Sequence, residues 1–187
     1  MSKGKVFIIS APSGAGKTTL VNRVLEGFSG FSFSVSATTR PARSYEQEGV
    51  HYYFITEADF RRRLSDGEFL EWQEVYEGRL YGTLKAEVER ILAEGKNPIF
   101  DVDVEGGLNI KKHYGNNAVA IFISPPSLTA LKERLRQRGS DNETEIARRL
   151  AKAEKEMAYR DRFDYVVVND ELEKATETLF AIVRAHI

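Results

Sequence analysis

A glycine-containing segment near the start of the chain has the residue types that bind phosphate. It follows the apolar run VFIIS of residues 6–10 and consists of Ala11, Pro12, Ser13, Gly14, Ala15, Gly16, Lys17, Thr18 and Thr19. Gly14 and Gly16 allow the backbone to curl so that several N–H groups point inward, and a helix that begins near Lys17 adds its positive end. Lys17 can reach the outer phosphates of ATP, and the Thr18 hydroxyl can join phosphate oxygens and water around Mg²⁺. The segment therefore predicts an ATP site that uses Mg²⁺.

The segment departs from the pattern GxxxxGK[ST] at one position, because Ala11 stands where the first glycine is expected. The first glycine of the pattern serves to set the turn at the start of the loop. The backbone N–H donors and the lysine that bind phosphate are retained in this sequence, so the departure matters only modestly. A plain tight turn is one alternative. A dinucleotide-binding loop that opens at Gly14 is another, but it requires Gly or Ala where Thr19 stands. The apolar strand before the segment and the helical pattern after it favour the phosphate loop.

Four short apolar runs predict the buried parallel strands that would position this loop. They are residues 6–10 (VFIIS), 97–104 (NPIFDVDV), 119–124 (VAIFIS) and 165–170 (YVVVND). Segments with helical spacing lie between and after them, at residues 20–25, 88–92 and 128–135 and from Leu172 onward. Strands that alternate with helices predict a three-layer α/β fold with a parallel core sheet and right-handed crossovers.

Two intervals interrupt this alternation. Residues 31–85 are rich in charge and contain short alternating runs such as HYYFIT, which predicts a small insertion with a mixed sheet. Residues 138–145 (RGSDNETE) are polar and lie between two helical patterns, which predicts a mobile flap. We therefore expect one core that carries two appended segments.

Composition limits the possible function classes. The 187 residues suffice for one packed domain with a small appended lobe. Lys and Arg number 27 against 28 Asp and Glu, so no excess of positive charge favours nucleic acid as a partner. The absence of cysteine excludes disulfides and thiolate metal sites, and it fits the cytoplasm. No apolar run reaches the ~18 residues of a membrane span, and the first residues do not resemble a signal peptide. The three histidines lack the spacing of a metal site.

Further motifs occur in a fixed order along the chain. After SAPSGAGKT they are SATTRPAR, EGVHYYF, FLEW, YGT, DVDVEG, RLRQRG and VVND. Together they resemble the guanylate kinase family in its bacterial form, in which alanine opens the phosphate loop. The resemblance extends from Val6 to Asp170, and the ordered set is far more specific than any single motif. It implies a P-loop nucleoside monophosphate kinase with a core (residues 1–34, 86–125 and 150–187), a GMP-binding lobe (35–85) and a helical lid (126–149).

The resemblance assigns nine residues to the acceptor GMP: Ser36, Arg40, Arg43, Tyr52, Glu71, Tyr81, Thr83, Asp101 and Asp103. Arg40 and Arg43 are three residues apart beside a proline, and each can form two parallel hydrogen bonds to a monophosphate. Tyr52 and Tyr81 can add hydroxyl donors. Without the resemblance, solvated arginines and packed tyrosines would be the commoner outcome.

Glu71 is the residue expected to select the base. Guanine presents adjacent N1–H and amino donors that one carboxylate accepts together, whereas N1 of adenine is an acceptor and would leave a buried carboxylate unsatisfied. Such a site can discriminate by ~10⁴ to 10⁵, and a salt-bridged glutamate on an edge strand is the alternative. Asp101 and Asp103 share one face of a predicted strand. They would contact guanine or the outer shell of Mg²⁺, with a solvated strand end as the alternative.

The resemblance also selects residues around the transferred phosphoryl group. Arg134, Arg138 and Arg149 match the lid arginines that neutralise its charge together with Lys17. Asn169 matches the adenine-side position, and a helix cap before Asp170 is an equally good interpretation. The reaction implied is ATP plus GMP giving ADP plus GDP, with deoxyguanylate as a further acceptor. The transfer is in line, needs no general base, and is protected from water by closure of the lobes.

Two other classes stay open from the sequence. Some relatives of the guanylate kinases are protein-binding modules without activity, and such a chain would be expected to lack the residues that correspond to Lys17, Arg40 or Arg43. A nucleotide switch that hydrolyses its ligand would need a guanine-reading motif on the donor side, and no such motif is found. Neither the oligomeric state nor the order of binding follows from the sequence.

Overall fold

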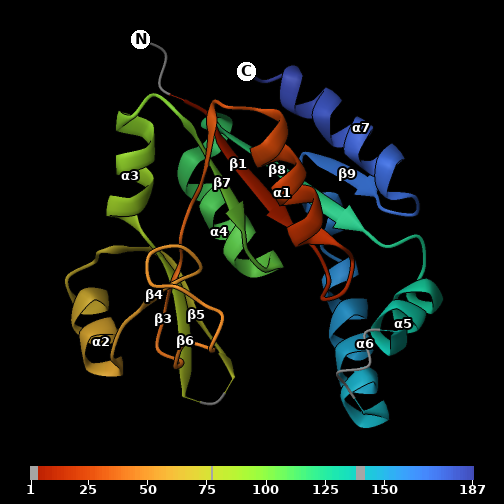
Figure 1. Ribbon diagram of the computed structural model, residues 1–187, viewed down its shortest axis with the longest axis horizontal. Helices are drawn as coiled ribbons and strands as arrows, with labels where there is room; N and C mark the ends of the chain where they lie inside the picture. Colours follow the sequence, from red (N-terminus) through yellow and green to blue (C-terminus); the bar gives the residue numbers. More distant parts are fainter. Residues whose placement is uncertain (1–3, 77, 138–141) are drawn as a thin grey trace.

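The computed structural model describes residues 4–76, 78–137 and 142–187 (Figure 1). Its core is a five-stranded parallel sheet in the order β2–β7–β1–β8–β9. These strands are β1 (Val6–Ser10), β2 (Phe31–Phe33), β7 (Asn97–Asp101), β8 (Ala118–Ser124) and β9 (Tyr165–Val168). The predicted parallel core sheet is therefore confirmed. The prediction that the insertion begins at residue 31 is wrong, because residues 31–33 form β2, the edge strand of the core sheet beside β7.

Helices cover both faces of this sheet. They are α1 (Lys17–Gly27), α3 (Lys85–Ala93), α4 (Val104–Tyr114) and α7 (Leu172–Arg184), with 3₁₀ turns at Gly115–Asn117 and Arg160–Arg162. On β1, Phe7 and Ile9 belong to the apolar cluster that α1 and α7 complete, whereas Val6 and Ile8 belong to the cluster on the α3 and α4 side. Successive side chains of a strand point to opposite faces, so the run VFIIS serves both clusters. The three-layer prediction is confirmed.

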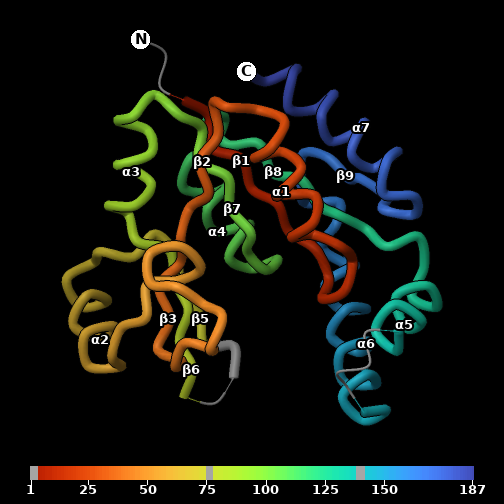
Figure 2. The backbone as a smooth tube through the Cα atoms, viewed as in Figure 1, coloured from red at the N-terminus to blue at the C-terminus, as the bar shows by residue number. Residues whose placement is uncertain are grey.

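A separate lobe contains the second sheet (Figure 2). Its strands are β3 (Ala37–Thr38), β4 (Tyr53–Phe54), β5 (Phe69–Tyr76) and β6 (Arg79–Leu84), in the order β4–β3–β6–β5, and it also contains α2 (Glu57–Ser65). β3 pairs in parallel with β4 and antiparallel with β6, so the sheet is mixed, as predicted. Phe60 of α2 stacks on Phe69 with ring centroids 4.2 Å apart, in a small core that includes Ala37 and Leu80.

A pair of helices forms a second appendage, which Figure 1 shows on the other side of the molecule from the small lobe. The helices are α5 (Leu128–Gln137) and α6 (Glu143–Met157), and they pack through Leu131, Leu135, Ile146 and Ala153. The flap prediction is wrong for residues 143–145. Asn142 Oδ1 accepts from the Glu145 N–H and Glu145 Oε2 accepts from the Asn142 N–H, a capping box that starts α6 there. Residues 138–141 lie outside the described residues. No helix in the described ranges has the length and apolar character needed to cross a membrane.

The segment after β7 corrects another prediction. The strand ends at Asp101 and not at Val104, because Asp103 is the N-cap of α4 and its Oδ1 accepts from the Gly106 N–H at 2.9 Å. Asp101 and Asp103 therefore do not share a strand face. One ends β7 and the other begins α4.

Gly107 lets α4 lie close to β1. A Cβ at this position would overlap Ser10 Oγ and lie 3.2 Å from Ile8 Cγ2. We expect Gly107→Ala to lower the free energy of unfolding by about 1–3 kcal/mol, because the added methyl group forces the helix away from the sheet. Urea denaturation measures this change. Asn109→Ala, on the exposed side of α4, should change stability by less than about 0.5 kcal/mol. Equal losses in the two variants would contradict the close seating of this helix.

Candidate active site

The loop that joins β1 to α1 adopts a curled conformation. Gly14 (φ +95°) and Gly16 (φ +91°) both lie in the left-handed region that favours glycine, and the Ala15 N–H donates to Pro12 O at 3.1 Å. Gly16 is the N-cap of α1, and no side chain caps this helix. The first N–H groups of α1 are thus oriented toward a ligand, as in sites that bind phosphate at a helix N-terminus.

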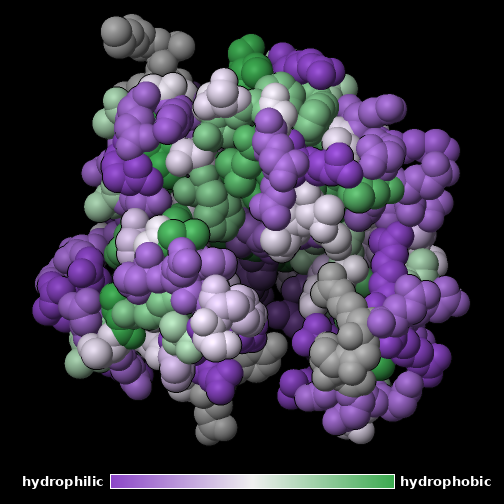
Figure 3. All heavy atoms as spheres, in the orientation of Figure 1, coloured by the Kyte–Doolittle hydropathy of each residue, from purple (hydrophilic) through white to green (hydrophobic). Residues whose placement is uncertain are grey.

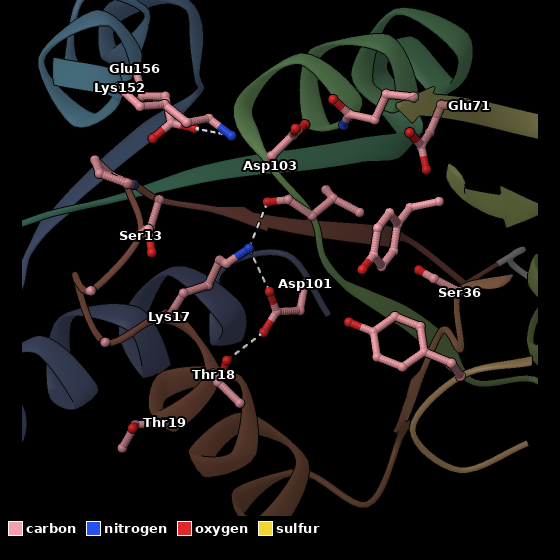
Figure 4. Close-up of a pocket in the computed structure, with 18 of the residues that line it drawn as sticks. Ser13, Lys17, Thr18, Thr19, Ser36, Glu71, Asp101, Asp103, Lys152 and Glu156 are labelled. Carbon is pink, nitrogen blue, oxygen red and sulfur yellow. Dashed lines mark hydrogen bonds and ion pairs between the residues drawn. The ribbon is translucent and has the colours of Figure 1, made fainter. Parts of the chain in front are cut away.

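Asp101 lies beside this loop because β7 is the neighbour of β1 in the sheet. Its Oδ1 is 2.5 Å from Lys17 Nζ, and its Oδ2 accepts from Thr18 Oγ1 at 2.9 Å (Figure 4). Lys17 Nζ also donates to Val102 O at 2.8 Å. These groups gather at the carboxyl ends of the parallel strands, where α/β folds bind their ligands. The hydroxyl and carboxylate oxygens are donors of the kind that Mg²⁺ prefers, so this donor set fits the predicted ion.

A cavity of about 460 Å³ extends from the loop toward the small lobe. Figure 3 shows the molecule hollowed between that lobe and the α5–α6 pair. Of the residues singled out in the sequence, those that line the cavity are Ala11, Pro12, Ser13, Gly14, Gly16, Lys17, Thr18, Thr19, Ser36, Tyr52, Glu71, Tyr81, Asp101 and Asp103. In Figure 4, Lys17 and Asp101 lie between Ser13 at one end and Ser36 at the other. Residues from both predicted sites therefore line one continuous space.

Glu71 is a buried carboxylate at the small-lobe end of the cavity. Its side chain is on β5, the residue is 8% exposed, and Oε1 accepts from Thr83 Oγ1 at 2.7 Å across the β5–β6 pair. The pKa of the Glu71 carboxyl is raised to about 7, chiefly by burial; the hydrogen bond from Thr83 lowers it, and the charge of Asp103 raises it. Within the described part of the chain no cation pairs with Glu71, which does not fit the salt-bridge alternative. Because Glu71 lines the cavity, a ligand there could bring further donors to this carboxylate.

Arg40 is fixed in place by a glutamate that the sequence did not single out. Its Nη1 and Nη2 donate to Glu46 Oε2 and Oε1 at 2.7 and 2.6 Å, and its guanidinium lies 5.1 Å from the ring centre of Tyr52. The rings of Tyr52 and Tyr81 meet edge to face at 6.0 Å. Arg43 is exposed and donates through Nη1 to the hydroxyl of Tyr45 at 2.9 Å. Arg40 is thus buried beside the two tyrosines, whereas the Arg43 side chain lies outside that cluster.

Two of the three arginines predicted for the lid, Arg134 and Arg149, flank the phosphate loop. Arg134 of α5 lines a second cavity, of about 380 Å³, together with Gly14, Gly16, Thr19 and Asn169, and its Nη2 donates to Asp170 O at 3.2 Å. Arg149 of α6 donates through Nη1 to Ser13 Oγ at 3.3 Å. Arg138 lies outside the described residues. The two described arginines thus approach the loop from different helices.

Asn169 supports the loop and is not the N-cap of α7. Its Nδ2 donates to Ala15 O at 2.8 Å, and the residue is buried. The N-cap of α7 is Glu171, so the cap interpretation of Asn169 is wrong. The amide lies so close to Gly16 that a Cβ there would overlap it. Gly16 is therefore required both for its backbone conformation and for this contact.

Three residues at the site were missed in the sequence: Glu46, Lys152 and Glu156. Glu46 pairs with Arg40 and lies in a loop. The residue pattern of a loop has no regular period, so the sequence could not place this side chain. Lys152 and Glu156 follow Arg149 by three and seven residues and line the larger cavity. Helical spacing from Arg149 was the signal that could have found them.

The fold and the site define a class of protein. A glycine loop between a parallel strand and a helix, a carboxylate at the end of the neighbouring strand, and a cavity that continues into a second lobe are together the features of a P-loop nucleotide kinase.

Comparisons with known proteins narrow this class. The pattern of the guanylate kinase family matches residues 3–186, and the chain belongs to that family. It is 48% identical to the guanylate kinase of Bacteroides fragilis over 182 residues, which cover 97% of this chain and 89% of the relative. It is also 48% identical to the guanylate kinase of Thermotoga maritima over 183 residues, which cover 98% of this chain and 87% of the relative.

Solved structures agree with the family assignment. A crystal structure of guanylate kinase from Anaplasma phagocytophilum matches with a TM-score of 0.75 at 32% identity and covers 99% of this chain and 87% of that chain. Shikimate kinase from Bacteroides thetaiotaomicron matches with a TM-score of 0.53 at 16% identity and covers 96% of this chain and 98% of that chain. The second likeness concerns the fold alone.

Proposed function

We propose that the chain transfers the γ-phosphoryl group of ATP to GMP, giving ADP and GDP, and that it accepts deoxyguanylate as well. Membership of the guanylate kinase family supports the reaction. The choice of GMP as the acceptor rests on the position of Glu71. This buried carboxylate accepts a hydrogen bond from the Thr83 hydroxyl and lies at the far end of a cavity that begins at the phosphate loop. Guanine brings two donors to this carboxylate, whereas adenine brings an acceptor at N1.

On the donor side, the loop of residues 11–19 holds the phosphates of ATP through its backbone N–H groups, of which Pro12 has none, and Lys17 neutralises the γ-phosphoryl group. We assign Thr18 and Asp101 to Mg²⁺, because their oxygens already lie together at the loop. The bound ion would screen the charge of the phosphates. Asn169 and Arg134 line the second cavity, which supports an adenine-side role for Asn169.

On the acceptor side, Arg40, Arg43, Tyr52 and Tyr81 bind the phosphate of GMP. Support comes from the packing of Arg40 against Tyr52 and of Tyr52 against Tyr81. We assign guanine to Ser36, Glu71, Thr83 and Asp103. The separate positions of the two aspartates support this division, since Asp101 bonds to the phosphate loop and the charge of Asp103 acts on Glu71.

Arg134, Arg138 and Arg149 serve as the cations of the lid. The contact of Arg149 with Ser13 supports its part in this proposal. We retain the division into a core, a GMP lobe (35–85) and a lid (126–149) as a prediction, although α6 continues through residue 149 to Met157. A cytoplasmic location and the exclusion of nucleic acid also stay predictions from composition.

A coupled assay for ADP, with ATP, Mg²⁺ and each nucleoside monophosphate in turn, tests the proposal. We expect turnover with GMP and deoxyguanylate, loss of turnover when Mg²⁺ is chelated, and a kcat/KM for AMP lower by about 10⁴-fold. ATP without an acceptor controls for hydrolysis. Turnover with another monophosphate and none with GMP would overturn the choice of substrate.

A further inference from the structure

One face of α6 carries charged residues toward the cavity, and two of them, Lys152 and Glu156, have no role in the proposed function. Arg149, Lys152 and Glu156 are spaced three and four residues apart and so lie on the same side of the helix. Arg149 contacts Ser13 of the phosphate loop, and Lys152 and Glu156 line the 460 Å³ cavity together with Lys17 (Figure 4). This face therefore borders the space in which the phosphates of the two nucleotides would meet.

Lys152 is held only loosely by Glu156. The distance from Lys152 Nζ to Glu156 Oε1 is 3.6 Å, longer than a direct hydrogen bond. The lysine also precedes the glutamate, which is the less favourable order for such a pair on a helix. The Lys152 side chain is 55% exposed, and a pair of this kind is stabilised little in water. The lysine itself therefore loses little when it leaves Glu156 for another anion.

Glu156, in contrast, has a fixed position. Its side chain is 12% exposed, and Met157 beside it packs against the core and accepts from Ser124 Oγ through Sδ. Glu156 Oε2 is buried and has no hydrogen-bond partner among the described residues. Burial raises the pKa of the Glu156 carboxyl, and the charge of Asp103 adds to this effect. The raised pKa favours the neutral form of the carboxyl, and its oxygen is 3.6 Å from Lys152 Nζ, so Glu156 competes only weakly for Lys152.

The charges that line the cavity show what Lys152 could do. Among the described residues that line it, two cations, Lys17 and Lys152, stand beside four carboxylates, which belong to Glu71, Asp101, Asp103 and Glu156. Lys17 is paired with Asp101 and Lys152 with Glu156, so each cation has a carboxylate that a phosphate can replace. Phosphate oxygens form stronger charge-assisted hydrogen bonds than a pair held at this distance.

We propose that Lys152 is a further phosphate-binding cation of the cleft, and that Glu156 is its counter-ion in the empty protein and is replaced by a nucleotide phosphate on binding. The inference rests on the proposed function and adds a residue to it. Lys152 lies on α6 about one helical turn after Arg149. It brings positive charge to the cavity from the helix, whereas Lys17 brings positive charge from the phosphate loop.

Substitution of Lys152 tests the first half of the proposal. Lys152→Gln should lower kcat/KM for GMP at saturating ATP by about 10- to 100-fold, because one charged hydrogen bond is lost. Lys152→Arg should stay within about threefold of wild type, since the charge is kept. Lys155→Gln removes the same charge from the same helix at a residue that lines only a smaller cavity, so it should leave kcat/KM unchanged. Thermal midpoints of all three should match that of wild type.

Calorimetry of ATP with Mg²⁺ at pH 8, without GMP, tests the second half. Glu156→Gln should tighten ATP binding by about threefold because Lys152 loses its competing partner, whereas Lys152→Gln should weaken it. A purely structural role for Glu156 would weaken binding in both variants, and that result would overturn the proposal. So would a Lys152→Gln variant that behaves like Lys155→Gln. Wild-type protein that fails to phosphorylate GMP would instead contradict the proposed function, while the calorimetry would still decide the role of Lys152.

Discussion

Lys17→Ala should lower kcat by about 10³-fold or more while GMP affinity stays nearly intact. In the empty protein the Lys17 ammonium lies at the phosphate loop, held by Asp101 at 2.5 Å and by Val102 O at 2.8 Å. It is therefore already in position when ATP arrives, and its charge acts on the group that is transferred. GMP depends on the other end of the cavity, which this substitution leaves unchanged.

Two measurements separate these effects. The coupled assay gives kcat, and calorimetry with GMP alone gives the affinity of the acceptor site. Lys174→Ala is a matched control, because Lys174 is exposed on α7 and pairs only with Glu171 among the described residues. A loss of GMP affinity as large as that caused by substitution of Glu71 would contradict the division into donor and acceptor sites.

Glu71→Gln should remove most of the preference for guanine. The glutamine amide has a C=O group that accepts and an NH₂ group that donates. Its NH₂ group would face one of guanine's two donors, which is unfavourable, whereas it could donate to N1 of adenine. We expect kcat/KM for GMP to fall by about 10²-fold, and its ratio to the value for AMP to fall by at least as much. Glu74→Gln, at an exposed position on the same strand, should change neither. An unchanged ratio in Glu71→Gln would remove Glu71 from base selection.

The same variant has a predicted effect on stability that depends on pH. The pKa of Glu71 is raised to about 7 in the folded protein, so the unfolded chain ionises at lower pH than the folded one. Stability is then lost as pH rises from the ordinary glutamate pKa through 7, and the full cost above pH 7 is roughly 3 kcal/mol. Glu71→Gln should therefore be more stable than wild type in urea denaturation at pH 8 and similar to it at pH 4. A stabilisation that is equal at both values would contradict the buried, ionising carboxylate.

The sequence predicted those parts of the fold whose requirements are local. The run of residues 6–10 is apolar on both faces because helices cover both sides of β1, and the positive φ angles of Gly14 and Gly16 explain why glycine stands there. α4 could not be predicted in this way, since Gly106 and Gly107 disfavour an isolated helix. The close contact of Gly107 with Ser10 requires glycine, and only the assembled fold shows that contact.

The arrangement of the site was predictable to a similar extent. Residue types and motif order indicated Glu71 and Arg40, but not that Thr83 would donate to one and Glu46 accept from the other. Such pairs join segments whose approach depends on the second sheet and its loops. Asp103 was placed on a strand because an alternating pattern continues through it, whereas its cap to Gly106 ends that pattern.

The two appendages each enclose a small apolar cluster of their own. Phe60 and Phe69 belong to one, and Leu131 and Ile146 to the other, and neither cluster merges with those that flank the core sheet. The side chains of each cluster can therefore keep their packing neighbours when the appendage pivots, and the contacts that must adjust are those of Leu70 in one appendage and Met157 in the other with the cluster on the α3 and α4 side. The energy needed to move either unit over a bound nucleotide then falls on the connecting backbone torsions and on these contacts at the edge of the core, and the centre of each cluster stays packed.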